Sequence, residues 1–223
     1  MEALWLSVRL ATCVAVILLL IGMPLAYWLS QTKWRGKFLL ESLVALPLVL
    51  PPTVLGFYLL LGLGANGLLG KLWIALFGHT LAFTFIGLVL ASVIYSLPFA
   101  VQPLVGAFES VDARLLDAAA VLGAGRWRTF RQIILPLSVP GLIAVSVFTF
   151  TGAWNELLLA LIFITSPDKR TVPVAIQYLI TGDVFRWGLI MAASVIAAVP
   201  VMALYYLAQR FVVQGLSAGT VKG

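Results

Sequence analysis

Residues that form disulfides and metal centres are almost absent from the sequence. It contains one cysteine, Cys13, and one histidine, His79. A disulfide within the chain is therefore excluded. A zinc site is strongly disfavoured as well, because such sites usually take three or four Cys and His ligands. We therefore expect no metal and no cofactor in this chain.

Charged residues are also scarce. They make up 10% of the chain, whereas 62% is hydrophobic and the mean hydropathy is +1.11. Soluble domains carry about a quarter charged residues, so this composition places the chain in a lipid bilayer. The net charge of +6 does not indicate a nucleic-acid partner, because excess Lys and Arg in membrane proteins normally marks the cytoplasmic loops.

Five apolar stretches reach the roughly 20 residues that a membrane-spanning helix needs. They are Leu10 to Leu29, Phe38 to Leu61, Leu81 to Phe99, Val139 to Ile164 and Trp187 to Ala208. A sixth span stays open, since 67–78 is short and interrupted and 171–180 is typical of an interfacial or re-entrant piece. The prediction is an all-α integral membrane protein with a single domain over 1–223.

The basic residues cluster in the segments that follow the first, third and fifth spans. These are Lys33, Arg35, Lys37, Arg114, Arg126, Arg128, Arg131, Arg210 and Lys222. With five alternating spans, all three segments lie on one side of the membrane. The positive-inside rule makes that side cytoplasmic, so the N-terminus is predicted outside and the C-terminus inside.

The cytoplasmic segment 103–138 contains an unusually polar stretch, DAAAVLGAGRWRTFRQIILP (117–136). Asp112 is a good N-cap for a first helix, Gly123 and Gly125 are expected to end it, and a second helix starts near Arg126 and closes at Pro136. Apolar residues at helical spacing form a predicted exposed ridge: Leu115, Leu116, Ala119 and Leu122, then Trp127, Phe130 and Ile134. Such a ridge fits a protein partner or a helix lying on the membrane surface, and periodicity does not distinguish the two.

Seven residues in this stretch stand at the spacing of the EAA signature, with Asp in place of the first Glu. They are Asp117, Ala118, Ala119, Gly123, Ile133, Leu135 and Pro136. At these positions the chain resembles the permease subunits of binding-protein-dependent ABC importers. The resemblance implies a type I ABC importer permease fold, with the 103–138 loop docking on cytoplasmic ATPase subunits and an external substrate-binding protein delivering the cargo.

The chain carries no phosphate-binding loop that could hydrolyse ATP. The nearest match, GANGLLGKL (64–72), has Ala65 where a glycine is needed and Leu72 where Ser or Thr would hold Mg²⁺. ATP and Mg²⁺ are therefore expected on a partner subunit. A permease of this size would need a second copy or a paralogue to enclose a pathway, and a homodimer is the simpler prediction.

Two groups of residues at membrane depth are candidates for the pathway. The second span holds Pro47, Pro51, Pro52 and Thr53, whose freed backbone groups would face protein or water; a merely kinked helix is the alternative. Glu156, beside Asn155, is the one acidic residue well inside a predicted span. Such a residue indicates a functional site or a hydrogen bond between helices.

The resemblance changes along the chain, which leaves the cargo open. Residues 1–150, including ESLVALPLVLPPTVLGFYLLL, resemble molybdate/tungstate-type permeases, whereas residues 151–223, including GAWNELLLALIFITSPDKRTVPVAI, resemble carbohydrate-type permeases. An oxyanion is the prediction and a carbohydrate the alternative. An intramembrane enzyme and a secondary transporter are disfavoured, since neither paired titratable groups nor inverted repeats are found.

Overall fold

The computed structural model describes residues 2–166, 169–181 and 184–220, and helices dominate these residues. The elements are α1 (Glu2–Gln31), α2 (Lys37–Val49), α3 (Pro52–Leu63), α4 (Leu68–Phe77), α5 (Phe85–Glu109), α6 (Ala113–Val121), α7 (Arg126–Thr129), the π-helical turn η1 (Phe130–Ile134), α8 (Leu135–Leu137), α9 (Val139–Trp154), α10 (Leu158–Phe163), α11 (Val172–Gln177), β1 (Ile180–Thr181), β2 (Val184–Phe185) and α12 (Trp187–Thr220). The two strands pair antiparallel in a short hairpin.

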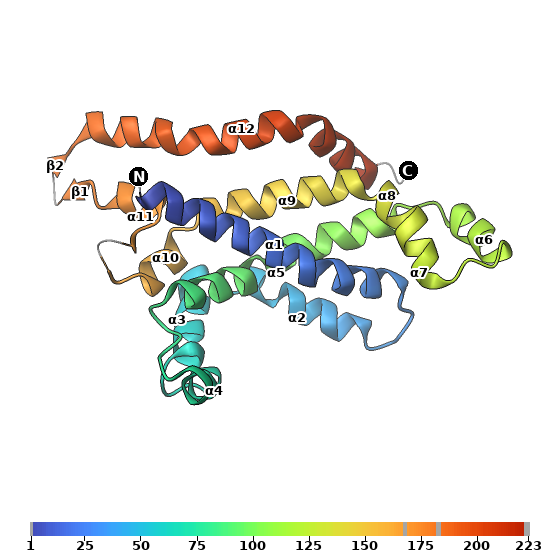
Figure 1. The fold of residues 1–223 in the computed structure, drawn as a ribbon, viewed down its shortest axis with the longest axis horizontal. Helices are drawn as coiled ribbons and strands as arrows, with labels where there is room; N and C mark the ends of the chain where they lie inside the picture. The colour runs from blue at the N-terminus through green and yellow to red at the C-terminus, as the bar shows by residue number, and fades with distance from the viewer. Residues whose placement is uncertain (1, 167–168, 182–183, 221–223) are drawn as a thin grey trace.

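Five helices run along the long axis of the molecule: α1, α2, α5, α9 and α12 (Figure 1). Helix α5 packs against α1, α2 and α9, and α12 packs against α9. Small residues allow these close approaches: a Cβ added at Gly22 of α1 would lie 3.5 Å from Leu104 Cδ1 of α5. Membrane helices associate through such small-residue contacts, because lipid provides no hydrophobic driving force between them.

Gly141 of α9 lies in close contact with Ala107 of α5. A Cβ at this position would lie 2.7 Å from Ala107 Cβ, so the two backbones must separate if the residue is enlarged. We expect Gly141→Ala to lower the apparent melting temperature in detergent, since overpacking costs about 1–3 kcal/mol. Gly152→Ala is the matched control on the same helix, because no atom lies within 4 Å of its added Cβ. An equal response of both variants would contradict this packing argument.

Five spans are the upper count in the structure, because two of the candidate spans are bent helix pairs: α2 with α3, and 126–137 with α9. Three helices are long and apolar enough to cross a membrane, and up to five spans result if each bent pair counts as one. The predicted span 38–61 divides into α2 and α3, and the chain direction bends by 111° between the two helices. The cause lies at Leu50 and Pro51, which are extended, because a proline disfavours helical backbone in the residue before it.

The other predicted boundaries shift as well. The span 139–164 is interrupted after Trp154, so α9 and α10 are separate helices. Helix α5 starts later than predicted because Thr84 caps it, with its side chain accepting a hydrogen bond from Gly87 N (3.1 Å). It also continues beyond Phe99 to Glu109, so the connecting segment begins at Ser110 and not at residue 103.

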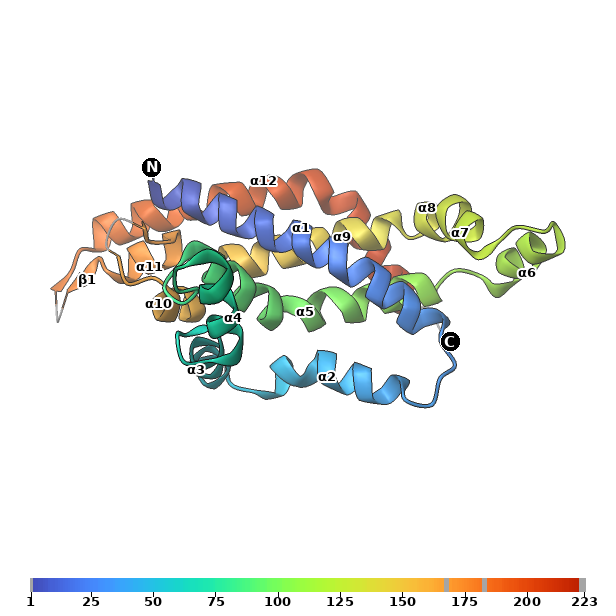
Figure 2. The ribbon, with the colours of Figure 1, turned by 60° about the horizontal axis from the view of Figure 1, so that its bottom comes forward.

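The basic segments lie at one end of the bundle, as predicted. Figures 1 and 2 place the α1–α2 linker, α6, α7, α8 and the end of α12 at this end, with α3, α4, α10 and α11 at the other. The stretch 67–78 contributes the ten-residue α4 and 171–180 contributes α11 and β1, both at the end opposite the basic segments. Of the basic residues, Lys222 lies outside the described residues.

Candidate functional site

Helix α6 has the N-cap and the C-terminal stop that the sequence predicts. Asp112 Oδ1 accepts a hydrogen bond from Arg114 N (2.9 Å) at the start of the helix. At its end, Gly123 adopts a positive φ of 74°, and the Gly123 and Ala124 amides donate to the Ala120 and Ala119 carbonyls. This is the Schellman arrangement, in which glycine is favoured because a side chain at positive φ is strained.

The second helix begins at Arg126 but does not end at Pro136. It passes from α7 through the π-helical turn η1 into α8 and ends at Leu137, followed by Ser138. The prediction that Pro136 closes this helix was wrong by one residue, since α8 includes Pro136 and ends at Leu137.

The predicted apolar ridge divides into a buried half and an exposed half. Phe130 and Ile134 are buried, and the Phe130 ring lies 4.5 Å from Tyr27 of α1 and 6.1 Å from Phe108 of α5, measured between ring centroids. Ser138 Oγ also donates to the Ala107 carbonyl of α5 (3.3 Å). These side chains hold the segment against the bundle, so they cannot belong to an exposed ridge.

The exposed half forms a tip at the far end of the molecule, around the turn between α6 and α7 (Figure 1). Val121, Leu122 and Trp127 are 88%, 85% and 72% exposed. Apolar side chains this exposed next to the glycine turn make this region a candidate docking surface. We call the exposed side chains of Val121 and Leu122 the docking tip; Trp127 is excluded, because its ring stacks on Phe130 (5.7 Å between centroids) and lines a cavity next to Tyr27 and Trp28 of α1.

The signature residues surround this tip in different environments. Ala119 is buried, and Ile133 and Leu135 are half-buried. The exposed members are Asp117, Ala118, Gly123 and Pro136.

A cavity of about 650 Å³ lies between α2, α3, α5, α9 and the residues before α10. It brings together three of the residues that the sequence singled out: Pro52, Asn155 and Glu156. Pro47 is buried inside α2, and Pro51 and Thr53 are exposed at the start of α3, so these three lie outside the lining. The α2–α3 bend is what brings Pro52 to the cavity wall.

Sequence reasoning missed the contribution of α5 to this cavity. Tyr95, Ser96 and Gln102 line it from α5, together with Pro98 and Pro103. Polar side chains beside two prolines in an otherwise apolar span were the signal that could have identified this wall, by the same argument that pointed to the second span.

Glu156 makes a local hydrogen bond, not one between helices. Its Oε1 accepts from Leu159 N (2.9 Å) in the first turn of α10, and the side chain is buried. Asn155 Nδ2 donates to the Thr151 carbonyl (3.0 Å) at the end of α9. The pair thus satisfies the backbone at the break between α9 and α10, where helix ends leave unpaired groups.

Removing the Glu156 carboxylate should loosen α10. We expect Glu156→Ala to destabilise the protein by about 1 kcal/mol, the usual loss when a helix-capping acceptor is removed. Glu156→Gln is the matched control, because its amide oxygen can still accept from Leu159 N. Apparent melting temperatures in detergent measure both variants, and a melting temperature of Glu156→Ala equal to that of the unsubstituted protein would exclude the capping role.

Sequence comparison finds a family match over most of the chain. Residues 18–218 match the family described as binding-protein-dependent transport system inner membrane component. The molybdenum transport system permease protein ModB of Azotobacter vinelandii is 46% identical over 177 residues, which are 79% of this chain and 78% of that protein. The maltose/maltodextrin transport system permease protein MalG of Vibrio parahaemolyticus is 34% identical over 227 residues, covering 100% of this chain and 73% of that protein.

Solved structures share the fold. A bacterial alginate ABC transporter, in complex with its alginate pentasaccharide-bound periplasmic protein, superposes with a TM-score of 0.77 at 17% identity, covering 93% of this chain and 76% of that chain. An inward-facing MetNI methionine ABC transporter gives 0.75 at 14% identity, covering 96% and 94%. At these identities the likeness concerns the fold alone, which is that of ABC importer permeases.

Proposed function

The chain belongs to the family of binding-protein-dependent transport system inner membrane components, and on this basis we propose that it forms the translocation pathway of an ABC importer for molybdate or a similar oxyanion. The observation that carries the cargo assignment is the 46% identity to a molybdenum transport permease over about four fifths of both chains. The resemblance of the first 150 residues to molybdate/tungstate-type permeases points to the same group.

ATP would be bound and hydrolysed, with Mg²⁺, by separate cytoplasmic ATPase subunits. The docking tip is the surface that would enter a groove on such a subunit, with the exposed signature residues Asp117, Ala118 and Gly123 beside it. Movement of the ATPase would reach the bundle through Phe130, which packs on α1 and α5. In this proposal the docking tip contacts the ATPase, and the buried Phe130 transmits the movement of the same segment to α1 and α5.

The end with the basic segments would face the cytoplasm, by the positive-inside rule. The N-terminus and the α4 and α11 end would then face outward, where the binding protein docks. The cavity beside Pro52 and Glu156 opens onto the surface of the single chain, so a second copy related by twofold symmetry would close the pathway.

A carbohydrate is the second candidate cargo. Its support is the identity to MalG, which is lower than that to ModB but extends over the whole chain. The buried Glu156 carboxylate in the cavity also suits hydroxyl groups better than a dianion, which it would repel.

The cargo can be tested by uptake. Cells that express the chain with a candidate ATPase and a candidate binding protein should accumulate radiolabelled molybdate in an ATP-dependent manner, and excess tungstate should compete. Radiolabelled maltose is the parallel measurement. Accumulation of maltose without molybdate would replace the oxyanion assignment by the carbohydrate one, and accumulation of neither would contradict both.

A further inference from the structure

A second cavity lies at the basic end of the molecule, between the end of α1 and the start of α7. Its volume is about 640 Å³. Trp28, Gln31 and Lys33 line it from α1 and the following linker, and Arg126 and Trp127 line it from α7. None of these five side chains lines the cavity beside Glu156, so the two sites are separate.

The lining of this cavity carries positive charge only. Lys33 and Arg126 are its two charged residues, and neither takes part in an ion pair among the residues that the structure describes. The nearby carboxylates are already engaged: Lys37 Nζ lies 3.4 Å from Glu41 and 3.6 Å from Glu109. The cavity is therefore complementary to an anion.

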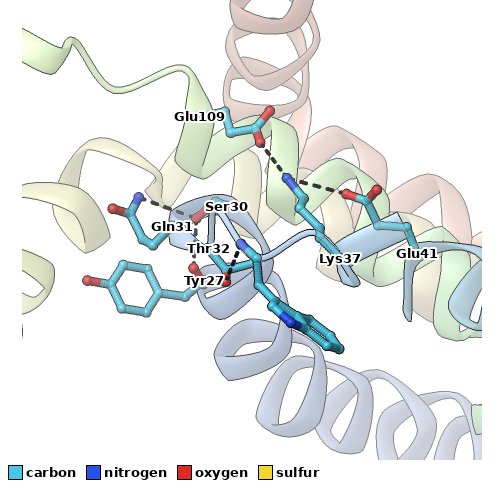
Figure 3. Close-up of polar contacts among 8 residues, drawn as sticks. Tyr27, Ser30, Gln31, Thr32, Lys37, Glu41 and Glu109 are labelled. Atoms are coloured by element: carbon cyan, nitrogen blue, oxygen red, sulfur yellow. Dashed lines mark hydrogen bonds and ion pairs between the residues drawn. The ribbon is translucent and has the colours of Figure 1, made fainter. Parts of the chain in front are cut away.

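The end of α1 is held in a defined conformation next to this cavity. Ser30 Oγ donates to the Tyr27 carbonyl (2.8 Å), and Trp34 N lies 3.4 Å from Thr32 Oγ1. Figure 3 shows the Tyr27 and Gln31 side chains directed away from the Lys37 bridge to Glu41 and Glu109. The end of α1 thus presents Tyr27 and Gln31 on one side, and the ion pairs of Lys37 in α2 lie on the other.

The position of Lys33 just after the end of α1 places the cavity at the depth of the lipid headgroups. No charged residue occurs between Arg9 and Lys33, and the helix rises about 33 Å from Arg9 to its end at Gln31. A bilayer has a hydrocarbon core of about 30 Å, so the two cations bracket it. Trp28 and Trp127 at this level are typical of the interfacial aromatic belt.

From this charge, depth and aromatic lining we infer that the cavity between α1 and α7 binds the headgroup of an anionic phospholipid, with Lys33 and Arg126 contacting the phosphate. Basic pockets beside membrane helices commonly hold such headgroups. A lipid bound here touches both α1 and the first turn of α7, and Phe130 on the same segment already packs on Tyr27. It therefore adds a second connection between the docking segment and the bundle.

The test measures lipid binding to the purified full-length protein by native mass spectrometry. Dioleoyl phosphatidylglycerol and dioleoyl phosphatidylcholine, which share their acyl chains, are titrated separately. The unsubstituted protein should bind phosphatidylglycerol preferentially. The double variant Lys33→Gln/Arg126→Gln should weaken that binding roughly 25-fold, because each basic residue near an anionic lipid contributes about a factor of five.

Arg35→Gln/Arg131→Gln is the matched control. It removes the same charge from exposed positions at the same end that do not line the cavity, so it should retain the preference. Equal weakening in both double variants would overturn the site, since the effect would then come from net charge. Protection of the protein against thermal unfolding by inorganic phosphate or molybdate, lost in Lys33→Gln/Arg126→Gln, would overturn the lipid assignment in favour of a free oxyanion.

Discussion

Leu122→Asp is expected to weaken binding of the ATPase subunits roughly 30-fold or more and to abolish ATP-driven uptake. Leu122 is 85% exposed at the end of α6, so its side chain contributes almost nothing to the fold of the isolated chain. In a docked complex it would be buried, and truncation or charging of a central contact typically costs 2 kcal/mol or more. The measurement is co-purification of the ATPase with the tagged permease, followed by uptake in the same cells.

The control for this variant is Leu68→Asp, the same substitution at a comparably exposed leucine in α4, at the opposite end of the bundle. It should leave ATPase binding unchanged. Undiminished co-purification with Leu122→Asp, in protein that is folded and inserted, would show that the docking tip does not contact the ATPase.

Phe130→Ala should have the largest effect on stability, and it should separate docking from transmission. The ring is buried between Tyr27 and Phe108, and removal of a buried aromatic side chain costs about 3–5 kcal/mol. The docking tip itself keeps its cap at Asp112 and its turn at Gly123. We therefore expect a lower apparent melting temperature and a severe loss of uptake, with ATPase binding reduced much less than in Leu122→Asp.

Phe130→Leu provides the comparison, since it keeps apolar volume between Tyr27 and Phe108. It should recover most of the stability and part of the uptake. A Phe130→Ala protein that transports normally would contradict the role of this aromatic cluster in transmission. If Phe130→Ala loses ATPase binding as completely as Leu122→Asp, the role of Phe130 in transmission cannot be separated from docking by the tip.

Local features of the fold were predictable because they depend on neighbouring residues. The N-cap at Asp112 and the stop at Gly123 are set by short-range hydrogen bonds and by the freedom of glycine at positive φ. The grouping of the basic segments at one end follows from counting alternating spans. The α2–α3 bend was missed because hydropathy measures how apolar a stretch is and not its direction, although Pro51 and Pro52 were visible.

The candidate sites were predictable only in part. The sequence singled out Pro52, Asn155 and Glu156 but could not bring them together, since their proximity depends on the bend after α2 and on the packing of α5 against α9. It also treated Phe130 and Leu122 as one ridge. Phe130 and Leu122 both occur at helical spacing, and only the contacts of Phe130 with Tyr27 and Phe108 distinguish this buried residue from the exposed Leu122.

The sequence by itself determined the membrane class and the shared end of the basic segments, and it singled out the seven signature positions, because composition, charge and spacing are properties of the chain alone. The tertiary structure decided which apolar residues of the docking segment are buried and which polar residues line the cavity beside Glu156. It also brought Lys33 and Arg126 together in the cavity between α1 and α7. These depend on contacts between residues distant in the chain, such as Tyr27 with Phe130, and no local pattern encodes them.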